Sequence, residues 1–197
     1  MRTMFRVAIA VAVLLACCSW FTPAEPKRHT VDVRKSSIVV HVYKAGFFSA
    51  FGHNHEIEAP IGSGEVIDEA GRSSVDLHVD ARRLRVLDPE VSSDTLAQIQ
   101  KTMLGAQVLD ADRYSDIRFR SATVEAKGAG RWLVNGIFDL HGQEHPLETE
   151  VTLKDGLYEG SFALKQTDFG ITPVAVAGGT VKVRDEVRIE FRIALSD

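Results

Sequence analysis

Apolar and polar residues alternate along most of the chain, and this pattern predicts β-strands. In the segment 75–80, valine and leucine alternate with aspartate and histidine, so one face is apolar and the other faces water. The same period of two recurs in the segments 117–120, 132–140, 147–154, 157–164 and 180–195. Gly136 interrupts one of these segments and predicts a bend or bulge, whereas Asp155-Gly156 predicts a hairpin turn. The sequence therefore predicts antiparallel strands joined by short turns.

One segment, from Pro89 to Gly105, follows a helical period instead. Leu96, Ile99 and Met103 recur three or four positions apart and form one apolar face. Polar residues at 92–94 can cap the start of this helix, and the glycine at its end suits a C-terminal cap. A single amphipathic helix cannot bury itself, so we expect it to lie on the sheet or to plug a barrel end.

The number and length of the strands favour a barrel over a sandwich. Eight or more antiparallel strands are compatible with both architectures. However, the strand through Trp132 and the final strand exceed about ten residues, where the usual strand has five or six. We therefore expect an all-β fold, an extended antiparallel β-barrel of about eight strands with one amphipathic helix. Such a barrel leaves an interior that holds either side chains or one small ligand.

The stretch 47–57 contains the most informative polar residues, because it combines three phenylalanines with two histidines. In a strand, Phe51, His53, His55 and Ile57 share one face, and the apolar members identify that face as the inward one. His145 has the parity of neighbouring apolar residues and is also expected to point inward. The sequence therefore predicts a pocket that is apolar along its length and polar at one end.

These three histidines allow three interpretations. Two imidazoles at positions i and i+2 are close enough to chelate, so His53, His55 and His145 are candidate ligands for Zn or Cu. They are equally candidates for hydrogen bonds to the head group of a lipid. The third interpretation is structural, with the imidazoles bonding backbone carbonyl groups at strand ends.

Large apolar residues on the inward parity are candidates for the pocket wall. The alternative is that the same side chains fill a solid core. The residues concerned are Phe51, Val75, Leu77, Phe119, Trp132, Phe162 and Phe191. No Gly-x-Ser-x-Gly elbow appears, and no nucleophile stands beside a base, so we expect no enzymatic activity.

The first 24 residues predict a secretory signal peptide. Two arginines precede an apolar run of 12 residues (7–18), and small residues offer a cleavage site after Ala24. This run is shorter than the roughly 20 apolar residues that span a bilayer. The segment 14–17 also resembles a lipobox, and a lipid anchor at Cys17 is the alternative.

Cleavage after Ala24 removes 24 of the 197 residues and leaves 173, which fits one domain at 25–197. Both cysteines leave with the leader, so neither a disulfide nor a thiolate contributes to the remaining chain. Two arginines leave as well, which changes the net charge from −4 to −6. An acidic surface argues against nucleic acid as a partner. We expect a periplasmic or secreted protein.

Taken together, several segments resemble the YceI-like proteins, which are periplasmic lipid- or polyisoprenoid-binding proteins. The likeness covers about residues 30–195 and rests on segments in the following order: 37–42 (SIVVHV), 51–55 (FGHNH), 74–77 (SVDL), 87–89 (LDP), 109–110 (LD), 114–121 (YSDIRFRS), 135–142 (NGIFDLHG) and 167–171 (TDFGI). The resemblance implies a lipocalin-like barrel with an isoprenoid-type lipid in its lumen. Asp168, in the last of these segments, is a further candidate ligand-binding residue; the alternative is that Asp168 accepts backbone hydrogen bonds in a turn.

The first hypothesis is therefore a non-catalytic carrier for a long apolar ligand. A periplasmic protein that binds Zn or Cu through His53, His55 and His145 is the alternative, and an enzyme acting on a lipid is the third. No cofactor other than the bound lipid or metal is expected. Contact with a membrane would serve lipid delivery, and an unpaired edge strand would support a homodimer as well as a monomer.

Overall fold

The computed structural model describes residues 25–45, 54–69, 71–176 and 181–196. Its strands are β1 (Lys27–Val31), β2 (Ser37–Ala45), β3 (His55–Glu58), β4 (Ile61–Glu69), β5 (Arg72–Asp80), β6 (Arg85–Val86), β7 (Asp116–Gly128), β8 (Arg131–Leu140), β9 (Gln143–Lys154), β10 (Leu157–Lys165), β11 (Ala175–Val176), β12 (Val181–Ile193) and β13 (Leu195–Ser196). The helical elements are α1 (Ser93–Leu104) and the 3₁₀ turns η2 (Ala81–Arg83) and η3 (Gln166–Phe169). The predicted leader, residues 1–24, lies outside the described residues and stays a prediction.

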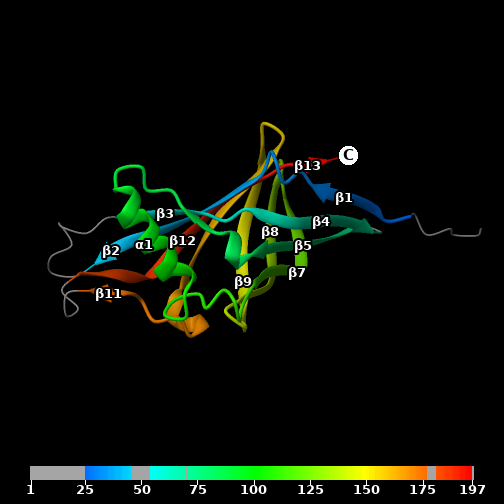
Figure 1. Ribbon diagram of the computed structural model, residues 1–197. Coiled ribbons are helices and arrows are strands. Elements are labelled where there is room, and N and C mark those ends of the chain that lie inside the picture. The colour runs from blue at the N-terminus through cyan, green and yellow to red at the C-terminus, as the bar shows by residue number, and fades with distance from the viewer. Residues whose placement is uncertain (1–24, 46–53, 70, 177–180, 197) are drawn as a thin grey trace, which may run out of the picture.

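The strands form one antiparallel sheet in the order β13-β1-β4-β5-β7-β8-β9-β10-β12-β2-β3-β6, and β11 pairs with β12 beside this path. Figure 1 shows that the sheet curls into a half-barrel. Only Ala194 separates β12 from β13, and β13 pairs with β1, where Leu195 stands opposite Val31. This nearly continuous strand therefore pairs with β10 and β2 through β12, and with β1 through β13. The fold is all-β, antiparallel and lipocalin-like, as predicted.

The prediction of about eight strands was wrong, since the described residues alone contain thirteen. Some long strands are interrupted, as where Asp32 turns the chain between β1 and β2 by accepting the backbone N–H groups of Arg34 and Lys35. The additions β6 and β11 have only two residues each, and segments this short do not show a recognisable alternation in the sequence. The strand expected within the stretch 47–57 corresponds to β3, which begins at His55.

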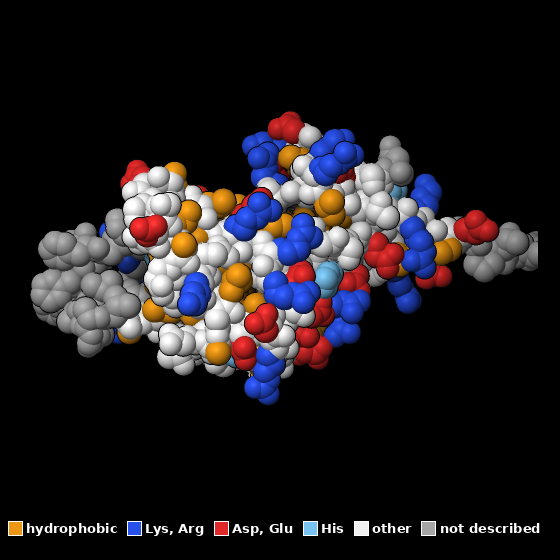
Figure 2. Space-filling view, in the orientation of Figure 1, with side chains coloured by type: hydrophobic (Ala, Val, Ile, Leu, Met, Phe, Trp, Pro, Cys, Tyr) orange, Lys and Arg blue, Asp and Glu red, His pale blue; other side chains and the backbone are white. Residues whose placement is uncertain are grey.

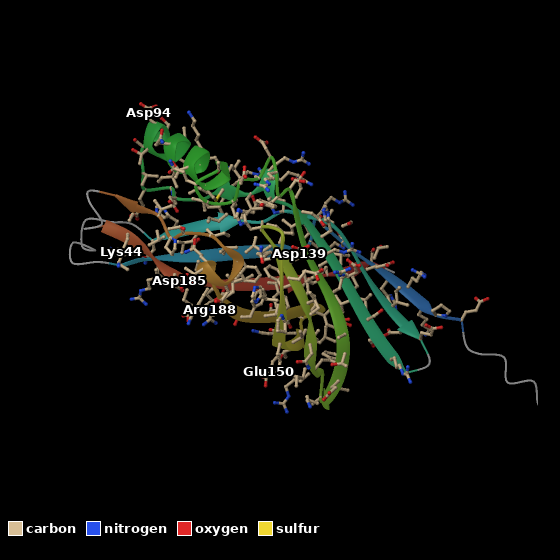
Figure 3. All side chains as sticks on the ribbon, turned by 90° about the horizontal axis from the view of Figure 1, so that it is seen from below. Lys44, Asp94, Asp139, Glu150, Asp185 and Arg188 are labelled. Carbon is tan, nitrogen blue, oxygen red and sulfur yellow. The ribbon has the colours of Figure 1, made fainter. Side chains whose placement is uncertain are left out.

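A bulge divides the sheet into two arms at one end. The register of β7 against β8 shifts between Ser121 and Thr123, opposite Gly136 and Asn135. A bulge bends a strand and increases its twist. At the end of the sheet away from α1, β1, β4 and β5 form one arm of the sheet, and β7, β8 and β9 form the other. The two arms diverge in Figures 1 and 3. The predicted irregularity at Gly136 is confirmed, although the extra residue lies in the facing strand.

Helix α1 is the one α-helix of the described chain and begins later than the predicted Pro89. Ser92 caps it by accepting the backbone N–H of Thr95 at 3.3 Å, and Gly105 follows its last residue. Gln100 fixes the helix to β6, because its Oε1 accepts the N–H of Val86 at 2.8 Å and its Nε2 donates to the carbonyl of Leu84 at 2.7 Å. The helix thus lies on the sheet, as expected for an amphipathic helix.

The most deeply buried apolar residues gather at the α1 end of the sheet. They come from α1, η3 and the ends of the strands beside them: Ile57, Ala59, Val79, Ala81, Leu84, Val86, Met103, Leu109, Ala111, Ile117, Phe169 and Ile171. The aromatic side chains that face the remaining interior, among them Phe119, Trp132 and Phe191, are only half-buried. The interior away from α1 is therefore incompletely filled. None of the helices in the described residues has the length and hydropathy that crossing a bilayer requires.

Candidate functional site

The curled sheet surrounds a cavity of about 1000 Å³. Its wall is mainly apolar and is formed by α1 and by most of the strands. On β12 and β13 the lining runs from Lys182 to Leu195, and at about 3.3 Å per residue this corresponds to about 40 Å of strand. Sites for small ligands have volumes of about 300 to 1000 Å³. The cavity is therefore large and elongated, and its shape suits a chain rather than a compact molecule.

The candidate wall residues of the described chain lie where the strand parity places them. Those that line the cavity are Val75, Leu77, Phe119, Trp132, Phe162 and Phe191. They do not fill the interior, so the alternative of a solid core is excluded for this part of the molecule. Phe51 lies outside the described residues. Contact of these side chains with a ligand stays a prediction.

Two glycines on the inward face make room for two of these rings. The ring of Phe119 packs over Gly136, and that of Phe191 packs over Gly160. A Cβ atom added at Gly160 would lie 2.6 Å from the carbonyl oxygen of Glu150 and would also overlap the Phe191 ring. The absence of a side chain at these positions gives the two rings room close to the backbone of the wall.

His55 is a polar member of the cavity wall, and a buried carboxylate orients it. Its Nδ1 lies 2.5 Å from Oδ2 of Asp88, whose side chain is 7% exposed. The other oxygen of Asp88 accepts the backbone N–H of Glu56 at 3.1 Å. Because the carboxylate can only accept, Nδ1 carries the proton and Nε2 is left for other partners. No local pattern in the sequence singles out Asp88 as a polar partner, although Asp88 belongs to the segment 87–89 that supports the family resemblance.

The three predicted metal ligands do not form a site in the described residues. His53 lies outside them, and His55 is bonded to Asp88. His145 packs against the ring of Phe169 at 4.8 Å and does not line the cavity. No group of three His, Cys, Asp or Glu residues in the described chain is arranged to hold a metal. The Zn or Cu alternative is therefore not supported.

Asp168 is exposed on η3 and does not line the cavity. The carboxylate that accepts the backbone hydrogen bond of this turn is that of Asp185, which bonds the N–H of Thr167 at 2.9 Å and also its hydroxyl. From the same turn Gln166 lines the cavity, with its Nε2 donating to the carbonyl of Arg184 at 2.8 Å. Asp185 therefore makes the turn hydrogen bond that was the alternative for Asp168, and contact of Asp168 with a ligand stays a prediction. No pattern in the sequence singles out Gln166.

Charged and polar residues line both ends of the cavity. Lys44 and Lys182 line it where β2 and β12 pair. Figure 3 shows Lys44 at that end of the sheet. His29 and Asp68 line the opposite end, on β1 and β4. Arg118 and Thr149 line the cavity along β7 and β9. The rest of the wall is mainly apolar, which agrees with the predicted pocket except that the polar residues are not confined to one end.

The outer face of the sheet carries ion pairs, and one of the paired residues, Arg118, also lines the cavity. Arg118 bonds Asp76 at 2.5 Å across β7 and β5, and Figure 2 shows basic and acidic side chains lying beside one another over much of the visible face. Asp139 on the same face has an oxygen without a hydrogen-bond partner. Burial raises its pKa, and the nearby carboxylates of Glu144 and Asp116 add to the effect. This mixed surface is typical of a solvated sheet face.

Comparison with known proteins extends over nearly the whole described chain. The sequence model of the YceI-like domain matches residues 29–195. UPF0312 proteins of Vibrio cholerae are 30% identical over 128 or 129 residues, which is 60% of this chain and 62% of theirs, so the chain spans less than two thirds of the length of these relatives.

Two solved structures resemble the fold. The structure of Burkholderia cenocepacia BcnA is similar with a TM-score of 0.66 at 18% identity, over 85% of this chain and 99% of that one. A Campylobacter jejuni YceI protein gives a TM-score of 0.46 at 12% identity, over 63% of this chain and 72% of that one. The first likeness supports the fold, and neither identifies a ligand.

Proposed function

The chain belongs to the YceI-like family, and we propose that it is a non-catalytic carrier that holds a long apolar ligand, of isoprenoid type, inside its barrel. The observation that carries this proposal is the elongated apolar cavity of about 1000 Å³, lined by half-buried aromatic and aliphatic side chains. We also propose that the carrier works in the periplasm or outside the cell, which follows from the predicted leader at residues 1–24.

The energetics of burial favour a chain-like ligand. Each methylene removed from water contributes about 0.8 kcal/mol, so one five-carbon isoprene unit contributes about 3 to 4 kcal/mol. Three or four such units offset the cost of association, which is estimated at about 4 to 15 kcal/mol. Affinity would therefore come from the length of the buried chain. Polar groups in the wall, such as His55, would select the head group.

A carrier role also fits the polar chemistry of the wall. His55 and Asp88 form an oriented pair, but no serine, threonine or cysteine nucleophile of the described chain is bonded to His55. The pair is suited to a hydrogen bond with a bound molecule.

Lipid extraction and mass spectrometry of the protein purified from its native host test the proposal directly. We expect a chain-like apolar lipid in an amount comparable to that of the protein. Recovery of bound Zn or Cu without any lipid would contradict the carrier role, and turnover of an added lipid substrate would contradict its non-catalytic nature.

A pair of substitutions on β9 tests the location of the ligand. Leu147 lines the cavity, whereas the adjacent Glu148 is exposed on the outer face. Leu147→Trp places an indole inside the cavity, so we expect it to weaken binding of a polyprenol at least about tenfold, or about 1.4 kcal/mol. Glu148→Trp adds the same group outside and should leave the Kd unchanged, as measured by isothermal titration calorimetry. Equal effects of the two variants would place the ligand elsewhere.

A further inference from the structure

We infer that the ligand enters and leaves the cavity sideways, through the gap between β5 and β7, and not past helix α1. This inference rests on the proposed function, because it concerns the path to the same cavity. It follows from three observations: where the ladder between these strands stops, what borders the gap, and how firmly α1 is attached at the opposite end.

The ladder between β5 and β7 covers only part of each strand. Its last pair is Asp76 opposite Arg120. Beyond that pair, one side-chain hydrogen bond from the N–H of Val75 to Ser121 still joins the two strands. The segment 72–74 of β5 is hydrogen-bonded to β4 alone, and the segment 123–128 of β7 is bonded to β8 alone. The two segments belong to the diverging arms seen in Figures 1 and 3. The sheet therefore has an unpaired gap in its wall at this place.

Both borders of the gap belong to the wall of the cavity. Ser73 and Val75 line it from β5, and Val124 lines it from β7, with Trp132 of β8 behind. The gap thus leads directly into the apolar interior.

The structure at the corner of the gap is defined by specific contacts. Ser121 accepts the backbone N–H of Val75 through its Oγ at 2.7 Å, in the place where a backbone carbonyl would continue the ladder. The bulge that follows turns β7 away from β5. The outward-facing residues along the rim, Ser74, Ala122 and Thr123, are small and exposed. Small side chains at the rim leave room for a flexible hydrocarbon chain to pass.

The α1 end requires much more disruption. Gln98, Ile99, Thr102 and Met103 of α1 line the cavity there, and Met103 is only 7% exposed. A ligand that leaves past this helix must displace it, which breaks both hydrogen bonds from Gln100 to the segment 84–86. Passage between the unpaired segments 72–74 and 123–128 breaks none of the hydrogen bonds described between β5 and β7. The lateral path therefore has the lower barrier.

A residue on the path and a residue in the binding site have different kinetic signatures. An obstacle on the path raises the barrier for entry and exit equally, so both rate constants fall while the Kd stays the same. An obstacle in the site changes the Kd. The rim residues Ala122 and Thr123 do not line the cavity, so a bulky group there should act on the rates alone.

The test uses single cysteines, in a Cys17→Ser/Cys18→Ser background, modified with a polyethylene-glycol maleimide. Thr123→Cys places the polymer at the rim, and Lys101→Cys places it on α1 at an exposed residue that does not line the cavity. Thr152→Cys places it on the outer face of β9 as a matched control. Stopped-flow fluorescence of Trp132 follows the binding of solanesol, a linear polyprenol. We expect the label at position 123 to lower both rate constants by about tenfold or more and to leave the Kd within about threefold. The labels at positions 101 and 152 should change neither the rate constants nor the Kd.

The outcomes separate the inference from the proposed function. Failure of the unlabelled protein to bind solanesol or any other long apolar chain would refute the proposed function and the path with it. Normal binding with unchanged rates after labelling at position 123 would overturn the lateral path only. Slower exchange caused by the label at position 101 would assign the path to the α1 end. Ala122→Cys provides a second rim variant if Thr123→Cys does not fold.

Discussion

At the scale of single residues, Asp88 shows how one buried carboxylate organises the polar wall of the cavity. It accepts hydrogen bonds from the ring of His55 and from the backbone of Glu56, and its own side chain is almost inaccessible to solvent. A buried donor that loses its acceptor costs about 1 to 3 kcal/mol. Removing this carboxylate would leave two donors without partners and would release the orientation of the imidazole.

Asp88→Ala should therefore lower the free energy of unfolding by about 1 to 3 kcal/mol, measured by urea denaturation. Asp168→Ala is the matched control, because Asp168 is exposed and makes no described hydrogen bond. We expect the control to change stability by less than about 0.5 kcal/mol. Equal losses in the two variants would show that the bonds of Asp88 do not contribute.

Asp80 gives a pH-dependent prediction. Hydrogen bonds from the side chain of Arg82 lower the pKa of Asp80 to about 2, from an ordinary value of 3.8. A carboxyl group whose pKa is lower in the folded protein stabilises the fold above its ordinary pKa, and this contribution disappears as the pH falls towards the folded value. Asp80→Asn should thus be less stable than the original protein at pH 7, and the difference should vanish between about pH 4 and pH 2. Thermal unfolding monitored by circular dichroism across this range measures it; a difference that stays constant would contradict the assignment.

The orientation of single residues could be predicted from the sequence, but their partners could not. Strand parity alone places Phe119, Trp132 and Phe162 on the inner face, because alternation fixes which way each side chain points. His55 and Asp88 are 33 positions apart, and no local period relates them. Such pairs depend on how the strands and loops come together in space.

At the scale of elements, the interior depends on glycines as much as on aromatic residues. Gly160 stands directly opposite Phe191, and the ring lies over its backbone. The helix α1 was predicted from its own period, since the signals for its face and caps are local. The short strand β6 and the bulge in β7 depend on neighbouring strands, so the sequence indicated only an irregularity near Gly136.

Gly160→Ala should destabilise the protein by about 1 to 3 kcal/mol, because the new methyl group meets the carbonyl of Glu150 and the ring of Phe191. Chemical denaturation measures the loss. The double variant Gly160→Ala/Phe191→Leu removes the clash with the ring but keeps the clash with the carbonyl of Glu150. We therefore expect it to recover only part of the free energy of unfolding that Gly160→Ala loses. An unchanged free energy of unfolding in Gly160→Ala would show that the backbone and the Phe191 ring can shift to accommodate the methyl group without loss of stability.

At the scale of the whole molecule, the unfilled interior makes stability depend on the ligand. The sequence predicted a barrel but left open whether its core is solid, because the same apolar residues can fill an interior or line one. Whether these residues fill the interior or line a cavity depends on the circumference of the sheet and on the divergence of its two arms. No single segment of the sequence determines either property.

A ligand that binds only the folded protein at one hundred times its Kd adds about 2.7 kcal/mol of stability. For a domain of this size, the Tm should rise by about 5 to 10 °C when a delipidated sample is given a saturating polyprenol. Differential scanning calorimetry measures the shift, and Leu147→Trp should reduce it. A Tm that does not respond to any long-chain lipid would contradict binding in the interior.

The pairing of β1 with β13 determines when this protein can finish folding. The hydroxyl groups of Thr30 and Ser196 lie 2.6 Å apart although 166 positions separate them in the chain. While a nascent chain is still being made, β1 has no such partner, and bringing together segments so distant in sequence is slow. Closure must therefore wait until synthesis has passed residue 196, and until then a hydrophobic sheet stays open to chaperones and to premature aggregation.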